Sequence, residues 1–474
     1  MTWFTSSQLR WVLARLSMGA LLLITSQGWG AGLNSALITV TAFPQPGTDT
    51  TELICHAAAV SVVPPVAVES VELPSDEELG AMLGPEPTPA GVNTPSLARS
   101  AQRNYKVAIF GDSHLAAGVF SRELMRLSQL PEEQIATSFI PATVERAGVR
   151  LALRKACALG RWSYEAAYVG NEAALYPGPG LATARALTAE AGFVVDLRDS
   201  QGQPQTNTLR VLYHQSEQVQ HIAIGIDGGE ELTVELPAGN PTAAAIEIRS
   251  PKAMARLSLR ALSEDFRFQG LQLPVRANTR LTLDVFGYPG ATVAAWQKIN
   301  GEYFAKWFQE QNYDLVVLWY GTNEGNVPVF DARAYESLLT DSLTRLRALF
   351  PSSQCLLLSP GDRGVLTRVS TSKRRKRLKL PKLRSALLKY STIHAQIAAI
   401  QSTVAARFGC SAYNLQQAMG GQGSAYRWSK TQPRKMAADL IHFTPQGYKE
   451  LADDFAQAVH WSALWSDTIT TPNP

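Results

Sequence analysis

Three separate segments of the chain carry side chains that could together perform acyl transfer. Ser113 lies in a Gly-Asp-Ser-His segment, Asn323 lies in a Gly-Thr-Asn-Glu segment, and Asp439 precedes His442 by three positions. A hydroxyl that attacks, an imidazole that takes its proton, a carboxylate that orients the imidazole and an amide that binds an oxyanion are the parts of a serine hydrolase. Each segment also has a simpler interpretation when it is taken alone.

Ser113 directly follows an apolar run that ends at Phe110. A serine at a strand-to-helix turn exposes its hydroxyl close to the helix N-terminus. The simpler interpretation is that Ser113 only caps the helix. The nucleophile-elbow motif G-x-S-x-G is absent, because Leu115 occupies its last position, and this argues against an ordinary α/β-hydrolase.

Two glycine-containing segments, 287–291 and 321–324, each follow an apolar run. Backbone N–H groups of glycine turns and the Asn323 amide could bind an oxyanion without titrating. Ordinary turn chemistry explains the same residues when each segment is taken alone.

Asp439 and His442 stand just before a segment in which Thr444 can cap a helix and Pro445 can open it. A spacing of three in a loop allows the aspartate to turn back onto the imidazole and fix its tautomer. The alternative is a loop histidine without a role.

The elements that must position these residues follow from the apolar pattern. Short apolar runs alternate with stretches of helical periodicity, which is typical of a parallel sheet covered by helices on both faces. We predict strands at 106–110, 281–286, 315–319, 355–359 and 412–415. We predict helices at 116–130, 332–350 and 387–408, and one after the second strand that buries Val293, Trp296, Ile299, Phe304 and Phe308. The fold class is therefore α/β, a flavodoxin-like doubly wound sheet, whose chemistry lies at the carboxyl ends of strands.

A β-rich stretch interrupts this alternation. Turns such as Asp227-Gly228-Gly229 separate short predicted strands at 193–197, 209–213, 220–226, 231–236, 244–249 and 255–262. We interpret it as an inserted β-sandwich, which could bind polysaccharide or serve as a structural lid.

The N-terminus resembles an export signal. Arg10 and Arg15 precede the apolar run 16–24, which is too short for the ~20 residues of a membrane span, and small residues follow it. The alternative is an uncleaved membrane anchor. The predicted location is the periplasm or the cell exterior, with no stable membrane span after removal of the signal. Residues 64–95 hold seven prolines and six acidic residues and indicate a linker.

Composition excludes several classes of protein. The formal charge is only +4, so a general nucleic-acid binder is not expected, and the hydrophobic content of 45% excludes a disordered chain. Eight basic residues gather at 373–384, where they could attract an anionic glycan or form a solvated loop. The scattered histidines and the four cysteines predict no metal centre and no cofactor. The cysteines are expected to be structural thiols or to form one bridge, with Cys355 and Cys410 as a possible pair.

Together, the order of Ser113, Gly290, Asn323, Asp439 and His442 resembles the SGNH, or GDSL-like, hydrolases. The resemblance implies Ser113 as nucleophile, His442 as general base and Asp439 as the carboxylate that orients it. It also implies an oxyanion hole made by the Ser113 amide, the Gly290 amide and the Asn323 side chain.

Gly287 competes with Gly290 for the glycine position of this pattern. We prefer Gly290, because Gly290-Ala291-Thr292 opens the next predicted helix.

A narrower resemblance is to the peptidoglycan O-acetylesterases of this group, which also place a sandwich between the serine and glycine segments. It rests on segments 111–114, 287–296, 320–324, 360–363, 418–421 and 439–448. It implies an exported serine esterase that removes 6-O-acetyl groups from N-acetylmuramic acid, with O-acetylated peptidoglycan as its partner. An O-acetyltransferase, an esterase of another O-acetylated polysaccharide and a non-catalytic glycan-binding protein are the alternatives.

The predicted organisation has six parts. In order, they are a signal peptide at 1–31, a Pro-rich acidic linker at 32–100, the first part of the catalytic domain at 101–180, the inserted sandwich at 181–277, the second part of the catalytic domain at 278–464 and a tail at 465–474.

Overall fold

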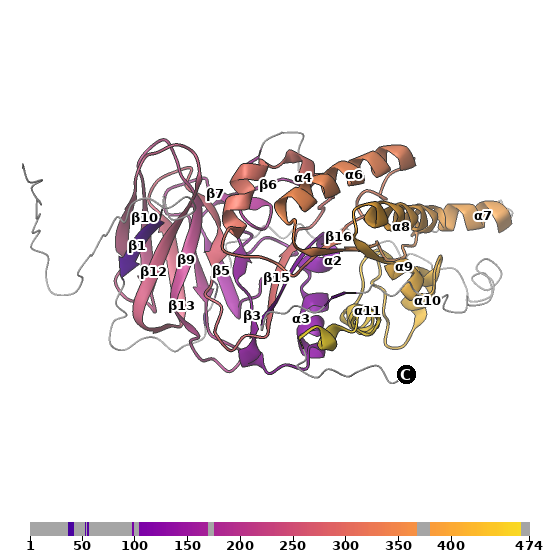
Figure 1. Ribbon diagram of the computed structural model, residues 1–474, viewed down its shortest axis with the longest axis horizontal. Helices are drawn as coiled ribbons and strands as arrows, with labels where there is room; N and C mark the ends of the chain where they lie inside the picture. The colour runs from indigo at the N-terminus through magenta and orange to yellow at the C-terminus, as the bar shows by residue number, and fades with distance from the viewer. Residues whose placement is uncertain are drawn as a thin grey trace, which may run out of the picture.

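A computed structural model describes residues 37–41, 53, 55, 97–98, 104–168, 175–366 and 380–465. Figure 1 shows a β-rich part on the left and, on the right, a sheet covered by helices. The predicted signal peptide, the linker at 64–95, most of the basic segment and the tail beyond 465 lie outside the described residues.

The helix-covered part is built on a six-stranded sheet in the order β18-β17-β16-β2-β15-β3, and every pairing in it is parallel. Its strands are β2 (Tyr105–Gly111), β3 (Ile135–Ala136), β15 (Leu281–Gly287), β16 (Leu315–Trp319), β17 (Gln354–Leu358) and β18 (Ser411–Tyr413). All five predicted strands are present. The two-residue β3 at the edge was not predicted, because so short a strand leaves no apolar pattern.

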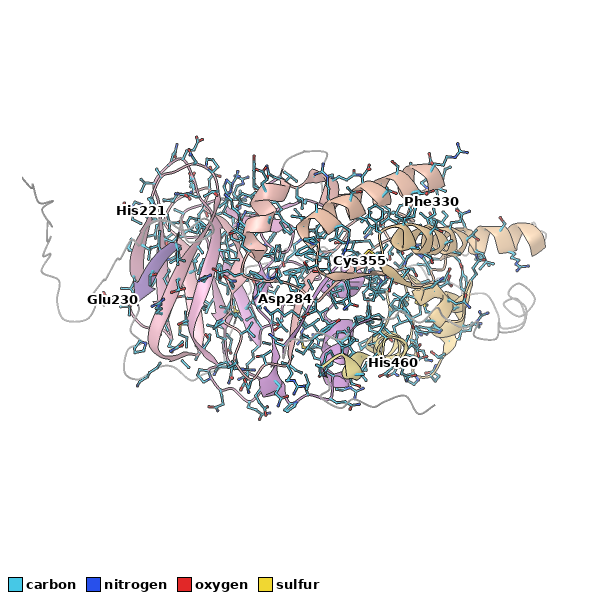
Figure 2. All side chains as sticks on the ribbon, in the orientation of Figure 1. His221, Glu230, Asp284, Phe330, Cys355 and His460 are labelled. Atoms are coloured by element: carbon cyan, nitrogen blue, oxygen red, sulfur yellow. A yellow bond between two sulfur atoms is a disulfide. The ribbon has the colours of Figure 1, made fainter. Side chains whose placement is uncertain are left out.

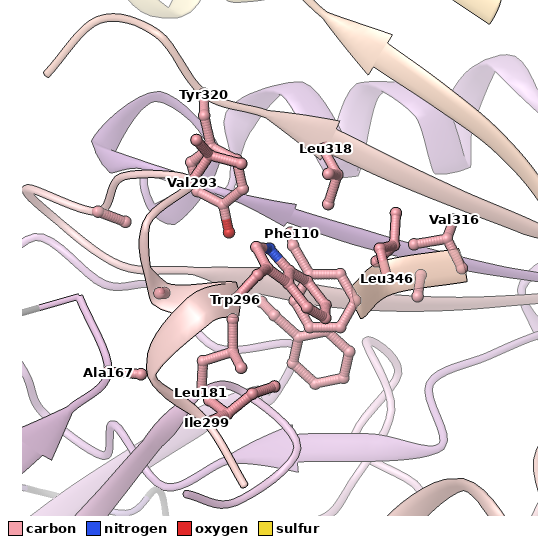
Figure 3. Packing of buried hydrophobic residues seen from close by; sticks show 14 of the residues in the cluster. Phe110, Ala167, Leu181, Val293, Trp296, Ile299, Val316, Leu318, Tyr320 and Leu346 are labelled. Carbon is pink, nitrogen blue, oxygen red and sulfur yellow. The ribbon is translucent and has the colours of Figure 1, made fainter. Parts of the chain in front are cut away.

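Successive residues of the strands face opposite cores. Val107 and Ile109 of β2 pack with α3 (Val119–Leu127) and α11 (Pro445–Ala458). Ala108 and Phe110 pack on the other face with α6 (Ala332–Leu349) and α8 (Lys389–Arg407). Figure 3 shows this second core, where the Phe110 ring meets the Trp296 ring edge-on at 4.9 Å between centroids. The sheet is therefore doubly wound, as predicted.

The helices differ from the prediction in their continuity. The helix expected at 116–130 is present as α3 and begins later than predicted, after Gly118 with φ 68°, while a separate short helix, α2 (Ser113–Ala116), precedes it. The helix expected after β15 is divided into α4 (Ala295–Lys298), α5 (Gly301–Ala305) and η3 (Lys306–Phe308), since Asn300 starts a new turn by capping Tyr303. The remaining helices are η2 (Glu132–Gln134), α7 (Leu380–Leu387), α9 (Leu415–Ala418), α10 (Ser424–Lys430) and η4 (Trp461–Trp465).

The β-rich part contains two sheets that share one hydrophobic cluster. A five-stranded sheet has the order β11-β10-β13-β8-β5, and a seven-stranded sheet has the order β1-β12-β9-β14-β7-β6, with β4 paired to β14. The strands are β1 (Leu37–Thr41), β4 (Phe139–Pro141), β5 (Lys155–Leu159), β6 (Trp162–Ala166), β7 (Ala182–Ala186), β8 (Gly192–Asp196), β9 (Thr206–His214), β10 (Gln220–Ile226), β11 (Leu232–Leu236), β12 (Ala243–Met254), β13 (Arg256–Ala261) and β14 (Arg267–Gln272). A role for this part as a separate carbohydrate-binding sandwich stays a prediction.

These sheets take in more of the chain than the sequence indicated. Strands β5 and β6 lie in the stretch expected to belong to the catalytic domain, and β1 lies in the stretch expected to be a linker. The β1 sequence Leu-Ile-Thr-Val-Thr is rich in β-branched residues and pairs in parallel with β12. Its partner is some two hundred residues away in the chain, so local pattern did not reveal the pairing.

Asp284 of β15 joins the two parts, and Figure 2 shows it in the middle of the molecule. Its carboxylate accepts hydrogen bonds from the Ser138 N–H at 2.7 Å, the Phe139 N–H at 2.9 Å and the Tyr313 hydroxyl at 2.8 Å. Residues 138 and 139 lead into β4 of the seven-stranded sheet. A fully buried carboxylate with this many donors ties β4 to the parallel sheet.

Two disulfides link Cys55 to Cys157 and Cys355 to Cys410, one more than the sequence led us to expect. The first attaches the N-terminal segment to β5, and the second attaches β17 to the segment after α8. None of the helices in the described ranges is long and apolar enough to cross a membrane.

Candidate active site

Ser113 is the first residue of α2, and the cap of this helix is the preceding residue. Asp112 accepts the His114 N–H at 2.9 Å through its carboxylate. The simpler interpretation of Ser113 as a helix cap is therefore wrong, because Asp112 performs that task. The chain reaches this turn through Gly111, where a Cβ would lie only 3.0 Å from the Trp319 carbonyl oxygen, so the end of β2 has little room for a side chain. The Ser113 hydroxyl is left available for another partner.

That partner is His442. The Ser113 Oγ lies 2.9 Å from His442 Nε2, and His442 Nδ1 lies 2.7 Å from Asp439 Oδ2. The other oxygen of Asp439 accepts the N–H groups of Ile441 and His442, each at 2.9 Å. Leu440 takes a left-handed conformation with φ 56°, which turns the chain back so that the three-residue spacing closes. The structure thus brings together the serine, histidine and aspartate singled out in the sequence.

The hydrogen bonds among these residues keep the Asp439 carboxylate ionised and make the His442 imidazole more basic. Burial acts to raise the pKa of Asp439, but hydrogen bonds from the His442 ring and the Ile441 and His442 N–H groups lower it to about 2. The hydrogen bond to Asp439 raises the pKa of His442 above its ordinary value, against the effect of burial. The imidazole is therefore a stronger base than a free histidine.

Asn323 and Gly290 lie beside Ser113 in the wall of one cavity of about 560 Å³. The Asn323 side chain donates to the Ala291 carbonyl at 2.8 Å, which leaves its second N–H for the cavity. Gly290 has φ 82°, and no atom lies within 4 Å of the position of its missing Cβ. Gly287, in contrast, packs under α2, where a Cβ would lie 2.4 Å from the Ala116 nitrogen. Gly290, rather than Gly287, borders the cavity.

Glu324 ends the Gly-Thr-Asn-Glu segment, and the sequence pattern did not indicate a role for it. It accepts the Val293 N–H at 2.8 Å and the Gly321 N–H at 3.0 Å, so it fastens the loop after β15 to the loop after β16. Burial raises the pKa of its carboxyl to about 7. Its position directly after Asn323 was the only signal in the sequence.

The buried His114 ring packs against the His442 ring of the site. Its ring stacks on Trp319 at 5.8 Å, lies 5.2 Å from the His442 ring and contacts the Tyr448 hydroxyl at 3.2 Å through Nδ1. Burial lowers the pKa of His114 to about 3, so this ring stays neutral beside His442.

Comparison with known proteins identifies a matching family and a similar fold. The GDSL-like lipase/acylhydrolase family matches residues 261–450, which confirms the resemblance to the SGNH hydrolases. A solved peptidoglycan O-acetylesterase is similar in fold, with a TM-score of 0.55, 19% identity, and coverage of 75% of this chain and 90% of that one. No curated protein matches the chain.

More distant similarity extends to carbohydrate esterases. A family 2 carbohydrate esterase with a carbohydrate-binding domain from Corynascus thermopiles (Myceliophthora fergusii) has 12% identity and a TM-score of 0.25, and the match covers 64% of this chain and 100% of that one. A family two carbohydrate esterase from Cellvibrio japonicus has 10% identity and a TM-score of 0.25, with 64% and 99% covered.

Proposed function

We propose that this SGNH-type esterase removes O-acetyl groups from a cell-wall polysaccharide, namely the 6-O-acetyl groups of N-acetylmuramic acid in peptidoglycan. The observation that carries the proposal is the hydrogen-bonded line from Ser113 through His442 to Asp439 at the wall of a cavity. The cavity volume of about 560 Å³ is within the range of small-molecule sites, about 300–1,000 Å³. The similarity in fold to a peptidoglycan O-acetylesterase supports this choice of glycan.

The reaction begins with proton transfer. His442 Nε2 takes the proton of the Ser113 hydroxyl while the oxygen attacks the acetyl carbonyl carbon. Asp439 holds the ring in the required tautomer and stabilises the imidazolium that forms. The sugar hydroxyl leaves with the proton returned by His442, and water then hydrolyses the acetyl-enzyme by the same steps.

The tetrahedral intermediates carry a negative oxygen that needs donors. We assign this task to the Ser113 N–H, the Gly290 N–H and the cavity-facing N–H of Asn323. Two of these donors are oriented before the reaction begins. The left-handed backbone fixes the direction of the Gly290 N–H, and the hydrogen bond to the Ala291 carbonyl fixes the Asn323 amide.

We also infer that the protein is exported to the periplasm or the cell exterior. The two disulfides support this, because such bridges persist in oxidising compartments. We assign the two sheets of the β-rich part a role in binding the glycan chain, as an inserted sandwich next to the parallel sheet.

The decisive experiment is measurement of acetate released from O-acetylated peptidoglycan and from O-acetylated xylan by the wild type and by Ser113→Ala. We expect release from peptidoglycan that disappears with Ser113→Ala. Release that persists in Ser113→Ala would contradict the mechanism, and release from xylan alone would contradict the glycan. Transfer of acetate to an added sugar alcohol in place of water would identify an O-acetyltransferase.

A further inference from the structure

Arg363 projects into the cavity from the segment that follows β17. Its neighbour Asp362 is fully buried and accepts hydrogen bonds from the Gln416 side chain at 2.7 Å and the Ala425 N–H at 2.8 Å. Because Asp362 anchors the turn, Arg363 is presented at the cavity wall that also contains His442.

Only some of the N–H donors of the Arg363 guanidinium have hydrogen-bond partners. One nitrogen donates to the Asn326 side chain at 2.9 Å, and the group lies 4.3 Å over the Tyr390 ring. Its Nε is buried without a hydrogen-bond partner, and none of the carboxylates in the described ranges forms an ion pair with it. Asp439 attracts it at longer range, but both oxygens of that carboxylate are occupied by His442 and Ile441.

A half-buried cation with unpaired N–H donors costs free energy unless a ligand supplies hydrogen-bond acceptors and negative charge. Burial lowers the pKa of Arg363, yet an arginine stays charged at every physiological pH. Its planar fork matches a carboxylate, which can accept two parallel N–H bonds. A neutral ligand would leave the charge uncompensated in a site partly removed from water.

Two further arginines lie close to Gly118, the residue that follows Ala117 of the cavity wall, but neither is itself a wall residue. Arg122 and Arg150 both approach Gly118, where a Cβ would lie 3.2 Å from Arg122 Nη1 and 3.2 Å from the Arg150 Cβ. Burial and the neighbouring charge of Arg150 lower the pKa of Arg122. Neither arginine forms an ion pair with a carboxylate of the described part of the chain, so two like charges lie close together beside Gly118.

We infer that the cavity is specific for acidic glycans, in which a carboxylate close to the acetylated position binds to Arg363 while Arg122 and Arg150 attract the rest of the anionic chain. The inference rests on the proposed function and narrows its substrate class. The carboxylate can belong to a peptide attached to the glycan, as in peptidoglycan, or to a uronic acid of the sugar chain itself. Both sources offer the same planar anion.

The kinetic test compares three acetylated substrates: peptidoglycan fragments that carry stem peptides, a polyuronate and neutral xylan. The wild type, Arg363→Gln and Arg363→Lys are compared on the pH-independent plateau of the rate. We expect Arg363→Gln to lower kcat/KM for the acidic substrate relative to xylan by on the order of 10-fold to 100-fold, mainly through KM. Arg363→Lys should recover only part of this preference, since it retains the charge but not the fork. Arg407→Gln, which removes an exposed arginine paired with Glu336, is the matched control.

The two acidic substrates separate the two sources of the carboxylate. If the wild type prefers the peptide-bearing fragments and Arg363→Gln abolishes this preference, the carboxylate that Arg363 binds belongs to the stem peptide. If the same holds for polyuronate, the carboxylate belongs to a uronic acid. An unchanged ratio of acidic to neutral kcat/KM in Arg363→Gln overturns the inference.

A binding test does not depend on turnover. Calorimetry of Ser113→Ala with the acidic oligosaccharides should show binding that weakens by at least about 10-fold when Arg363→Gln is added. Absence of acetate release from any glycan would refute the proposed function, whereas this loss of binding would still support the anion site. Equal binding with and without Arg363 would refute the anion site even if acetate is released.

Discussion

The Asn323 amide donates to the Ala291 carbonyl across 2.8 Å, so the loop after β16 is joined to the loop after β15 at the cavity that Ser113 borders. The bond uses one N–H of the amide and orients the other. Because Asn323 is held by backbone before any substrate binds, it is preorganised for the charge that develops on the ester oxygen.

We therefore predict that Asn323→Ala lowers turnover by about 10²–10³-fold, the effect of removing one oxyanion donor. KM should change little, since the donor acts mainly on the intermediate. Steady-state acetate release measures this, and a thermal unfolding curve close to that of the wild type shows that the fold is retained. A near-normal turnover would remove Asn323 from the mechanism.

The rate should rise with pH as His442 loses its proton, because only the neutral imidazole can accept the Ser113 proton. The hydrogen bond from Asp439 raises the pKa of His442, so the midpoint of the rise in kcat/KM should lie above about 6.5, the value of an ordinary histidine. A flat profile from mildly acidic to neutral pH would contradict this assignment.

Asp439→Asn should move that midpoint to lower pH and lower the rate by about 10⁴-fold, because the amide neither stabilises the imidazolium nor selects the tautomer. The pH profile distinguishes this effect from simple loss of fold. Asp265→Asn, which changes an exposed carboxylate in the β-rich part, is the matched control and should leave the profile unchanged.

Glu324 should make stability depend on pH. Burial raises the pKa of its carboxyl from 4.5 to about 7, so between these values the folded protein retains a proton that the unfolded chain has lost. The free energy of unfolding therefore falls as the pH rises through this window, by about 3 kcal/mol at most.

Glu324→Gln removes this titration. The free energy of unfolding of the variant should therefore decrease less between pH 4.5 and about 7 than that of the wild type. Urea unfolding at several pH values measures the difference. Glu336→Gln, at an exposed position of α6, is the control. Parallel curves for the wild type and Glu324→Gln would show that Glu324 does not titrate in this window.

Removal of the Cys355–Cys410 disulfide by the double change to alanine should lower the free energy of unfolding by about 2–4 kcal/mol. The bridge closes a loop with a sequence separation of 55, so its loss releases conformational entropy to the unfolded chain. Denaturant unfolding measures the loss, and mass spectrometry without reduction verifies the bridge in the wild type. Equal stability with and without the bridge would contradict this prediction.

The parallel sheet was predictable because its strands are buried on both faces. In β16, every residue from Leu315 to Trp319 is buried, and such an apolar run is visible without any knowledge of its neighbours. The pairing of β1 with β12 was not predictable. The five residues of β1 indicate a strand but carry no information about which distant strand it pairs with. The later start of α3, after Gly118, was missed because one glycine does not interrupt helical periodicity.

The sequence by itself determined the alternation of strands and helices, and with it the positions of Ser113, Asn323, Asp439 and His442 at the ends of elements, because burial and local capping depend on neighbouring residues. Only the tertiary structure decided that Gly290 borders the cavity while Gly287 packs beneath α2. It also decided that Glu324 ties two loops together and that Arg363 enters the cavity of Ser113. These relationships depend on the order of the strands across the sheet, which brings segments distant in sequence to the same edge.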